Sequence, residues 1–471
     1  MPSPPTRRRL LQGAAATALL GAAGTAWWAT RRRPPNIVLI LTDDQGYNDI
    51  GCYWDPPDDG PYQSIRTPRL DRMASEGVRL TDFYVAASIC TPSRAALLTG
   101  CYPPRVGYGA KDGGLGVHSP RSKGGLHPAE QTIADVLKAR GYRTACVGKW
   151  HLGHHPPFRP TAQGFDDFFG ILWSNNQQPL PLVHNDEVIR RLPDRPVLVR
   201  QLTTSAIEWM SRREDEPFFM YLAYSAPHEP WAVLPEFRGS SERGLYGDII
   251  ESVDHYVGVL LDALEMQGKA EDTLVVFTSD NGPWLHPMGG SAHPFRGGKA
   301  ESYEGGVRSP CIWRWPGVLP AGRVVEEVVT ALDLLPTFAG LAGASLPTRP
   351  IDGRDAWPVV AEGATSTYGP FFYYARGRLE AVREGRFKLM FDNPIRPEPV
   401  PEALYDLTAD PGETTDVRDA HPEVLARLRQ HAQTMRAKLG DAILGLEGTE
   451  ERTVGVWDDA QQRLVPVPTG D

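Results

Sequence analysis

Short, continuous apolar runs alternate with amphipathic stretches from about residue 34 onward. Runs such as residues 36–42 and 217–224 have no polar face, which is typical of parallel strands that are buried on both sides. Amphipathic stretches such as residues 244–267 lie between such runs and predict helices. This alternation predicts an α/β fold with a large mixed, mainly parallel sheet covered by helices on both faces. Further strands are predicted at 78–85, 142–147 and 272–278, and further helices at 68–77 and 129–140.

The pattern changes after about residue 345. Short apolar stretches at 371–374, 379–384 and 387–391 predict antiparallel strands, and residues 422–439 predict a helix. We therefore expect a smaller C-terminal α+β subdomain built on a short antiparallel sheet. The expected divisions are a leader (1–33), a large α/β domain (34–345), the C-terminal subdomain (346–445) and a tail (446–471).

Composition narrows the possible functions. The chain has 471 residues, 41% of them hydrophobic, which is enough to bury large cores. Its net charge of -9 at pH 7 argues against a nucleic-acid partner bound through bulk positive charge. Five cysteines are too few, and odd in number, for a disulfide scaffold. Nothing in the sequence predicts the oligomeric state.

Residues 1–33 resemble a twin-arginine export signal. Arg7 and Arg8 precede an uncharged stretch rich in Ala, Leu and Gly at about 10–26. This predicts export by the twin-arginine machinery to the periplasm or the cell exterior, with the leader cleaved or retained. An N-terminal membrane anchor is the alternative, because paired tryptophans and three arginines follow a run long enough to cross a bilayer.

Polar side chains follow four of the predicted strands, at the point where each strand ends. Since the carboxyl ends of parallel strands meet at one edge of a sheet, we expect these side chains to lie close together. They are Asp43, Asp44, Lys149, His151, His228, Asp280 and Asn281. The oxygen ligands among them suit a hard cation such as Ca²⁺ or Mg²⁺ better than zinc. Each residue alone is more typical of a helix cap, a turn, a surface lysine or a structural histidine than of a functional site.

Residues 90–100 place a thiol and an arginine four positions apart at the start of a predicted helix. Pro92 suits the first turn of a helix, so Cys90 is expected at or near the N-terminus, where negative charge is favoured. Arg94, one turn later, is expected to clamp an oxyanion. Taken alone, Cys90 is also typical of a small buried side chain.

Two of these segments resemble the signatures of the sulfatase family. The first runs from Cys90 through Thr, Pro and Ser to Arg94 and on to Gly100, and the second is residues 148–153. The order and spacing of the other polar segments, including Lys299, are similar to the group of arylsulfatase A and N-acetylgalactosamine-6-sulfatase. The resemblance covers residues 34–417. It implies an alkaline-phosphatase-like fold and hydrolysis of a sulfate ester, on an aryl or carbohydrate alcohol.

The resemblance also implies a role for each site residue. In this family a formylglycine-generating enzyme oxidises the signature cysteine to Cα-formylglycine, whose hydrated aldehyde provides the nucleophile. Ca²⁺, or alternatively Mg²⁺, is implied as bound by Asp43, Asp44, Asp280, Asn281 and the modified Cys90. The implied remaining roles are sulfate binding for Lys149, Lys299 and Ser174, diol binding for Arg94, proton donation to the leaving alcohol for His228, and proton removal for His151.

Two other functional classes fit parts of the sequence. A phosphate or phosphonate monoester hydrolase has related acidic pairs, although we find no second full set of His and Asp ligands for a two-zinc site. A carbohydrate-binding protein without activity is disfavoured by the complete set of reactive side chains.

Around the site, Trp173, Trp231 and Trp284 are candidates for stacking on a sugar ring or for packing. Asn175, Asn176, Gln177 and Gln178 are candidate sugar contacts by position only. The glycine-rich residues 108–125 predict a flexible rim loop.

Overall fold

The computed structural model describes residues 33–56, 64–109, 116–212, 216–286, 289–366, 368–394 and 400–465. The predicted leader therefore lies outside the described residues, except for Arg33. Within the described ranges, no helix is both long enough and apolar enough to cross a membrane.

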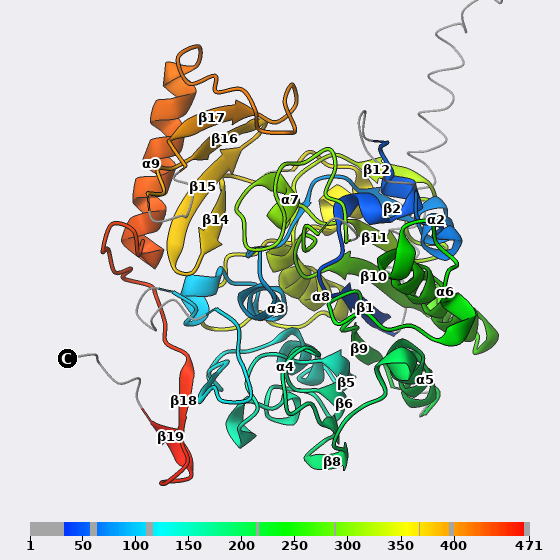
Figure 1. Ribbon diagram of the computed structural model, residues 1–471. Helices are drawn as coiled ribbons and strands as arrows, with labels where there is room; N and C mark the ends of the chain where they lie inside the picture. Colours follow the sequence, from blue (N-terminus) through cyan, green and yellow to red (C-terminus); the bar gives the residue numbers. More distant parts are fainter. Residues whose placement is uncertain are drawn as a thin grey trace, which may run out of the picture.

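A ten-stranded mixed sheet forms the centre of the larger part of the molecule (Figure 1). Its strands are, in spatial order, β12 (Arg323–Val325), β2 (Val78–Leu80), β11 (Cys311–Arg314), β10 (Thr273–Ser279), β1 (Asn36–Thr42), β9 (Phe218–Ala223), β5 (Arg143–Lys149), β6 (Asp167–Ile171), β7 (Leu182–His184) and β8 (Glu187–Arg190). The middle strands β10, β1, β9, β5 and β6 are all parallel to their neighbours within this set. The strands β11, β7 and β8 pair in antiparallel fashion.

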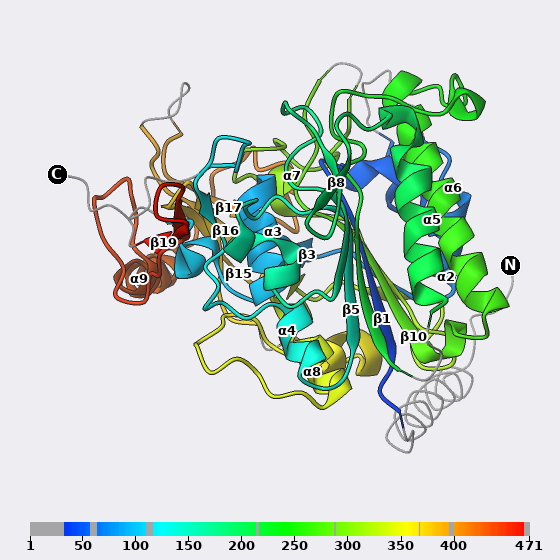
Figure 2. The same ribbon diagram turned by 90° about the horizontal axis from the view of Figure 1, so that it is seen from below.

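Helices cover both faces of this sheet (Figure 2). One face carries α2 (Pro68–Ser75), α5 (Leu198–Met210) and α6 (Gly244–Met266), and the other carries α3 (Cys90–Thr99), α4 (Ile133–Lys138) and α8 (Leu334–Ala342). Residues 37–41 of β1 are fully buried between the two layers. Burial on both sides explains the continuous apolar runs and confirms the predicted α/β sandwich.

A four-stranded antiparallel sheet follows toward the C-terminus (Figure 1). It consists of β14 (Phe371–Ala375), β15 (Arg378–Glu384), β16 (Phe387–Met390) and β17 (Ala403–Asp406), and α9 (Pro422–Leu439) packs on β15 and β16. This confirms the predicted antiparallel unit. The hairpin β18 (Gly455–Asp458) and β19 (Arg463–Val465) pairs with β4 (Gly124–Gly125), far back in the chain. The predicted domain boundaries stay predictions.

Two predicted elements have other bounds in the structure. Helix α4 begins only at Ile133, because the Thr132 hydroxyl caps it by accepting from the Asp135 backbone N–H at 3.3 Å. The strand predicted at 78–85 is interrupted and continues as β3 (Phe83–Tyr84), which pairs with β13 (Val329–Thr330) in a separate small sheet.

A fully buried cluster of charges joins the two parts of the molecule. Glu304 lies on the short helix α7 (Glu304–Val307), Lys388 lies on β16, and Glu413 follows β17. The Lys388 Nζ is 3.0 Å from Glu304 Oε1 and 2.7 Å from Glu413 Oε1, and all three side chains have no exposed surface. Tyr373 of β14 also donates to Glu304, at 2.8 Å. The large sheet and the C-terminal sheet thus share one set of neutralised charges.

Candidate active site

Two acidic segments meet at the carboxyl end of the large sheet. Thr42 and Ser279 are register partners on β1 and β10, so Asp43 and Asp280, the next residue of each segment, are brought side by side. The Asp280 backbone N–H donates to Thr42 O at 3.1 Å. Asp44 follows with a φ of 65°, a left-handed conformation that Asp adopts more readily than most residues. The three carboxylates are buried at the edge predicted from the strand ends.

Cys90 is the first residue of α3, as the sequence predicts. Its Sγ lies 3.5 Å from Asp43 Oδ1, and the residue is 1% exposed. Burial raises the pKa of the Cys90 thiol to about 12. The unmodified side chain is therefore a neutral thiol at physiological pH, and a neutral thiol is a weak nucleophile.

Arg94 lies one turn into α3 and is completely buried. Its Nε and Nη2 are 2.9 and 2.8 Å from Asp280 Oδ2, and its Nη1 donates to the Lys149 carbonyl at 2.9 Å. A buried guanidinium requires such counter-charges. Arg94 thus links the ends of β5 and β10, and its predicted role at an oxyanion stays a prediction.

Two lysines bind the acidic pair. Lys149 Nζ lies 2.6 Å from Asp43 Oδ2, and Lys299 Nζ lies 2.6 Å from Asp44 Oδ2. Burial alone would raise the pKa of Asp43, but the cations around it, Lys149 foremost, hold that pKa well below its usual value. Ser174 Oγ is 3.4 Å from Lys149 Nζ. The predicted sulfate-binding residues therefore lie together around the two carboxylates.

His228 lies on the same side of the acidic pair. Its Nε2 is 3.5 Å from Asp44 Oδ2 and 3.4 Å from Ser174 Oγ. Its Nδ1 is 2.6 Å from the Glu229 carbonyl oxygen, which assigns the Nδ1 proton to that hydrogen bond. Burial lowers the pKa of His228, although the nearby aspartates oppose this effect. Nε2 is thus the nitrogen that remains for chemistry within the site.

His151 has the opposite arrangement of its two ring nitrogens. Its Nε2 lies 2.9 Å from the His118 carbonyl oxygen, whereas its buried Nδ1 has no hydrogen-bond partner among the described residues. Burial, assisted by the positive charges of Lys149 and Arg94, lowers the pKa of His151 well below its usual value. A neutral imidazole with a free Nδ1 lone pair can accept a proton.

His118 is a contributor that the sequence analysis did not single out. Its carbonyl oxygen also accepts from Gln177 Nε2 at 3.1 Å, and its ring Nε2 is 3.0 Å from the Tyr108 hydroxyl. Both Tyr108 and His118 are buried, so these parts of the predicted rim loop pack beneath the site; residues 110–115 lie outside the described ranges. No local sequence signal marks a residue that acts through its backbone carbonyl.

The amide side chains next to Ser174 also hold the site together. Asn175 Nδ2 donates to the His228 carbonyl at 3.1 Å, and Gln177 Oε1 accepts from the Ser174 backbone N–H at 3.2 Å. Of the predicted tryptophans, Trp173 is buried and its ring N–H donates to the Pro179 carbonyl, so it has the packing role rather than stacking on a sugar ring. Trp284 remains 51% exposed.

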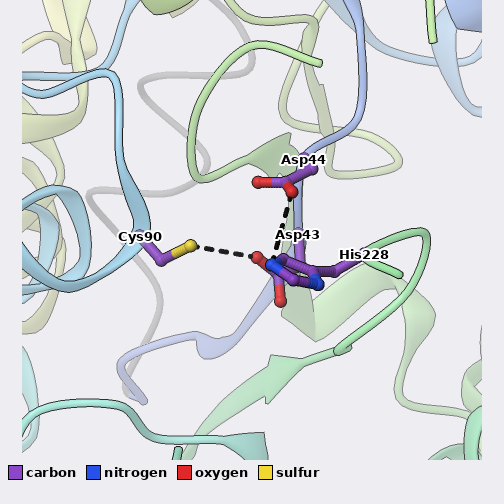
Figure 3. A group of neighbouring side chains, drawn as sticks. All are labelled: Asp43, Asp44, Cys90 and His228. Atoms are coloured by element: carbon purple, nitrogen blue, oxygen red, sulfur yellow. Dashed lines mark hydrogen bonds and ion pairs between the residues drawn. The ribbon is translucent and has the colours of Figure 1, made fainter. Parts of the chain in front are cut away.

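The donor set fits a hard cation. Four possible ligand atoms lie within 4.8 Å of one another, from Asp43, Asp44, Cys90 and His228 (Figure 3). Asn281 donates through Nδ2 to Asp44 at 2.8 Å, and its Oδ1 is buried without a partner in the described part of the chain. Burial, reinforced by the neighbouring Asp43, raises the pKa of Asp280 to about 7. Crowded carboxylates and an orphaned amide oxygen are what an oxygen-ligated cation satisfies.

Comparisons with known proteins identify the family of this chain. The family model described as Sulfatase matches residues 35–344, and one described as N-sulphoglucosamine sulphohydrolase, C-terminal, matches residues 298–438. Arylsulfatase A of Homo sapiens is 40% identical over 461 residues, covering 86% of this chain and 88% of that protein. N-acetylgalactosamine-6-sulfatase of Canis lupus familiaris is 39% identical over 377 residues, covering 75% and 71%.

A solved structure extends the likeness to three dimensions. The crystal structure of Ps i-CgsB in complex with k-i-k-neocarrahexaose superposes with a TM-score of 0.77 at 30% identity, covering 89% of this chain and 96% of that one. The first family model alone spans more than half of the sequence. The chain belongs to the sulfatase family and is a sulfuric ester hydrolase.

Proposed function

We propose that this sulfatase cleaves the sulfate ester of a carbohydrate or aryl alcohol, using Cα-formylglycine made from Cys90 and a bound Ca²⁺ or Mg²⁺. One observation carries the proposal: Cys90, Lys149 and Lys299 all contact the Asp43–Asp44 pair, from three distant segments. These contacts support a nucleophile at Cys90, because a carboxylate pair that suits a cation and two ammonium groups that suit sulfate oxygens lie beside it.

The residues divide the chemistry among them. A hydrated formylglycine at position 90 would supply one hydroxyl for attack on sulfur and a second for the release of sulfate. A cation held by Asp43, Asp44, Asp280 and Asn281 would offset sulfate charge. Lys149 and Lys299 place positive charge at the sulfate oxygens. With its Nδ1 proton held by the Glu229 carbonyl, His228 can donate a proton from Nε2 to the leaving alcohol only in its doubly protonated form, next to Ser174. His151 would accept the proton of the second hydroxyl at its free Nδ1 as sulfate is released.

The substrate class follows from the relatives. Two of the relatives are named arylsulfatase A and N-acetylgalactosamine-6-sulfatase, and the superposed structure holds a neocarrahexaose. These names support a sulfated carbohydrate as the substrate, with aryl sulfates as convenient analogues.

A panel of paired esters tests this function. Sulfated sugars and 4-nitrophenyl sulfate are assayed beside the same alcohols carrying phosphate. We expect kcat/KM for the sulfate to exceed that for the phosphate by at least about 100-fold, or about 2.7 kcal/mol. The described residues offer one cation site rather than the pair that two-metal phosphatases use. Preference for phosphate esters would support the phosphate or phosphonate monoester hydrolase instead.

We also propose that residues 1–33 export the folded protein by the twin-arginine route. Since that route carries folded proteins, Cys90 is modified before export. Replacing Arg7 and Arg8 with Lys should retain the protein in the cytoplasm, as fractionation and immunoblotting would show. Replacing Arg32 and Arg33 in the same way serves as the matched control. Undiminished periplasmic yield of the first variant would contradict the proposal.

A further inference from the structure

A cavity of about 860 Å³ opens between the large sheet domain and the tip of the β14–β15 hairpin. One wall is formed by Ser88, Ile89 and Pro92, which flank Cys90, and by Ala300, which follows Lys299. The Ala300 backbone N–H donates to Ser88 O at 2.8 Å, so the two segments form one surface. The cavity therefore adjoins the segments that carry the nucleophile position and a sulfate-binding lysine.

The charged side chains that line this cavity are mostly basic. They are Arg296, Glu301, Arg376 and Arg378. Arg378 is paired with Glu380 at 2.9 Å, and Arg296 lies 4.0 Å over the Tyr303 ring while donating to the Glu413 carbonyl. Arg376 is exposed and has no hydrogen-bond or ion-pair partner among the described residues. One guanidinium at the cavity is thus left for a ligand.

The backbone at Arg376 points to a role for its side chain. Ala375 and Arg378 pair across the hairpin, so Arg376 and Gly377 form a two-residue turn with φ values of 51° and 73°. Turns with positive φ at both central residues favour Asn, Asp or Gly at the first of them. An arginine at that position has a backbone conformation that it disfavours, and residues in disfavoured conformations are concentrated at ligand-binding positions.

We propose that this cavity binds a second anionic group of the substrate, a carboxylate or a further sulfate, and that Arg376 contacts it. The proposal rests on the proposed function, because the ester at Cys90 must belong to the same saccharide. The cavity has the size of a typical small-molecule site, and Tyr374 and Tyr405 in its lining offer aromatic surface to a sugar ring. A planar guanidinium matches both carboxylate and sulfate oxygens.

Calorimetric titration of the full-length protein tests the proposal, with Cys90→Ala present so that no turnover occurs. The probes are a chondroitin 6-sulfate tetrasaccharide, its unsulfated form and its carboxyl-reduced form. Arg376→Asn should weaken binding of the chondroitin 6-sulfate tetrasaccharide about tenfold. Weaker binding of the unsulfated probe would identify a carboxylate, and weaker binding of the carboxyl-reduced probe alone would identify a sulfate.

Two controls keep the test decisive. Asn suits the left-handed turn, so Arg376→Asn should melt no lower than the parent protein. Arg238→Asn removes an exposed arginine that does not line the cavity and should leave all three affinities unchanged. Unchanged affinities in Arg376→Asn, or no binding of any probe to the parent, would overturn the proposal. Turnover of 4-nitrophenyl sulfate by the unaltered enzyme tests the sulfatase chemistry separately.

Discussion

Cys90→Ala, produced in a host that has the formylglycine-generating enzyme, is expected to lose at least about three orders of magnitude of kcat on 4-nitrophenyl sulfate. Removal of a catalytic nucleophile has effects of this size or larger. The peptide that contains residue 90 of the unaltered protein should carry an aldehyde when examined by mass spectrometry. Because Cys90 is only 1% exposed, conversion has to occur before the segment is packed in place.

Cys52→Ala is the matched control for this loss. Cys52 is partly exposed and contacts Asp71 and Arg79 rather than the site, so its removal should leave kcat unchanged. A preparation with an entirely unmodified thiol at Cys90 and full activity would exclude the formylglycine mechanism.

Removal of divalent cations by a chelator is expected to reduce activity by at least about 100-fold, a loss of about 2.7 kcal/mol. Added Ca²⁺ or Mg²⁺ should restore it and Zn²⁺ should not, because the proposed ligands Asp43, Asp44, Asp280 and Asn281 all offer oxygen atoms. Thermal unfolding gives an independent measure. A cation at 100 times its Kd stabilises the folded state by roughly 2.7 kcal/mol, so chelation should lower Tm.

Asp44→Asn should weaken the response of Tm to Ca²⁺, because one carboxylate of the cluster is lost. Asp262→Asn is the matched control, since Asp262 is 40% exposed and pairs with Arg69 on the surface. Equal Ca²⁺ responses in the two variants, or activity unaffected by chelation, would argue against a catalytic cation.

The buried parallel strands could be predicted because their sequences carry a strong signal. Strands β1, β9 and β10 are covered on both faces, so their central positions form continuous apolar runs. β8 gave no such signal, since all of its residues are exposed. The direction of each strand could not be predicted either. β11 runs antiparallel to both of its neighbours, β10 and β2, and an apolar run does not indicate the direction in which its strand is paired.

The site could be predicted where chemistry follows the end of a strand. Asp43, Lys149 and Asp280 lie at the ends of β1, β5 and β10, which are parallel strands of one sheet, so their carboxyl ends share the edge that the strand ends in the sequence predict. The residues that orient the site side chains could not be predicted. His151 is held by the backbone carbonyl of His118, 33 positions earlier, and a contact through a backbone carbonyl does not depend on residue type.

The buried cluster of Glu304, Lys388 and Glu413 has a consequence for how the chain can be shortened. A polypeptide that stops before β16 lacks Lys388, the cation nearest to the buried Glu304, and leaves only the more distant Arg308 and Arg383, at 3.7 and 3.9 Å, to balance that carboxylate. Glu304 lies only five residues beyond Lys299, so the loss of Lys388 affects the segment that carries a predicted site lysine. A premature stop codon between Glu304 and β16 is therefore expected to destabilise the protein although it spares every predicted site residue.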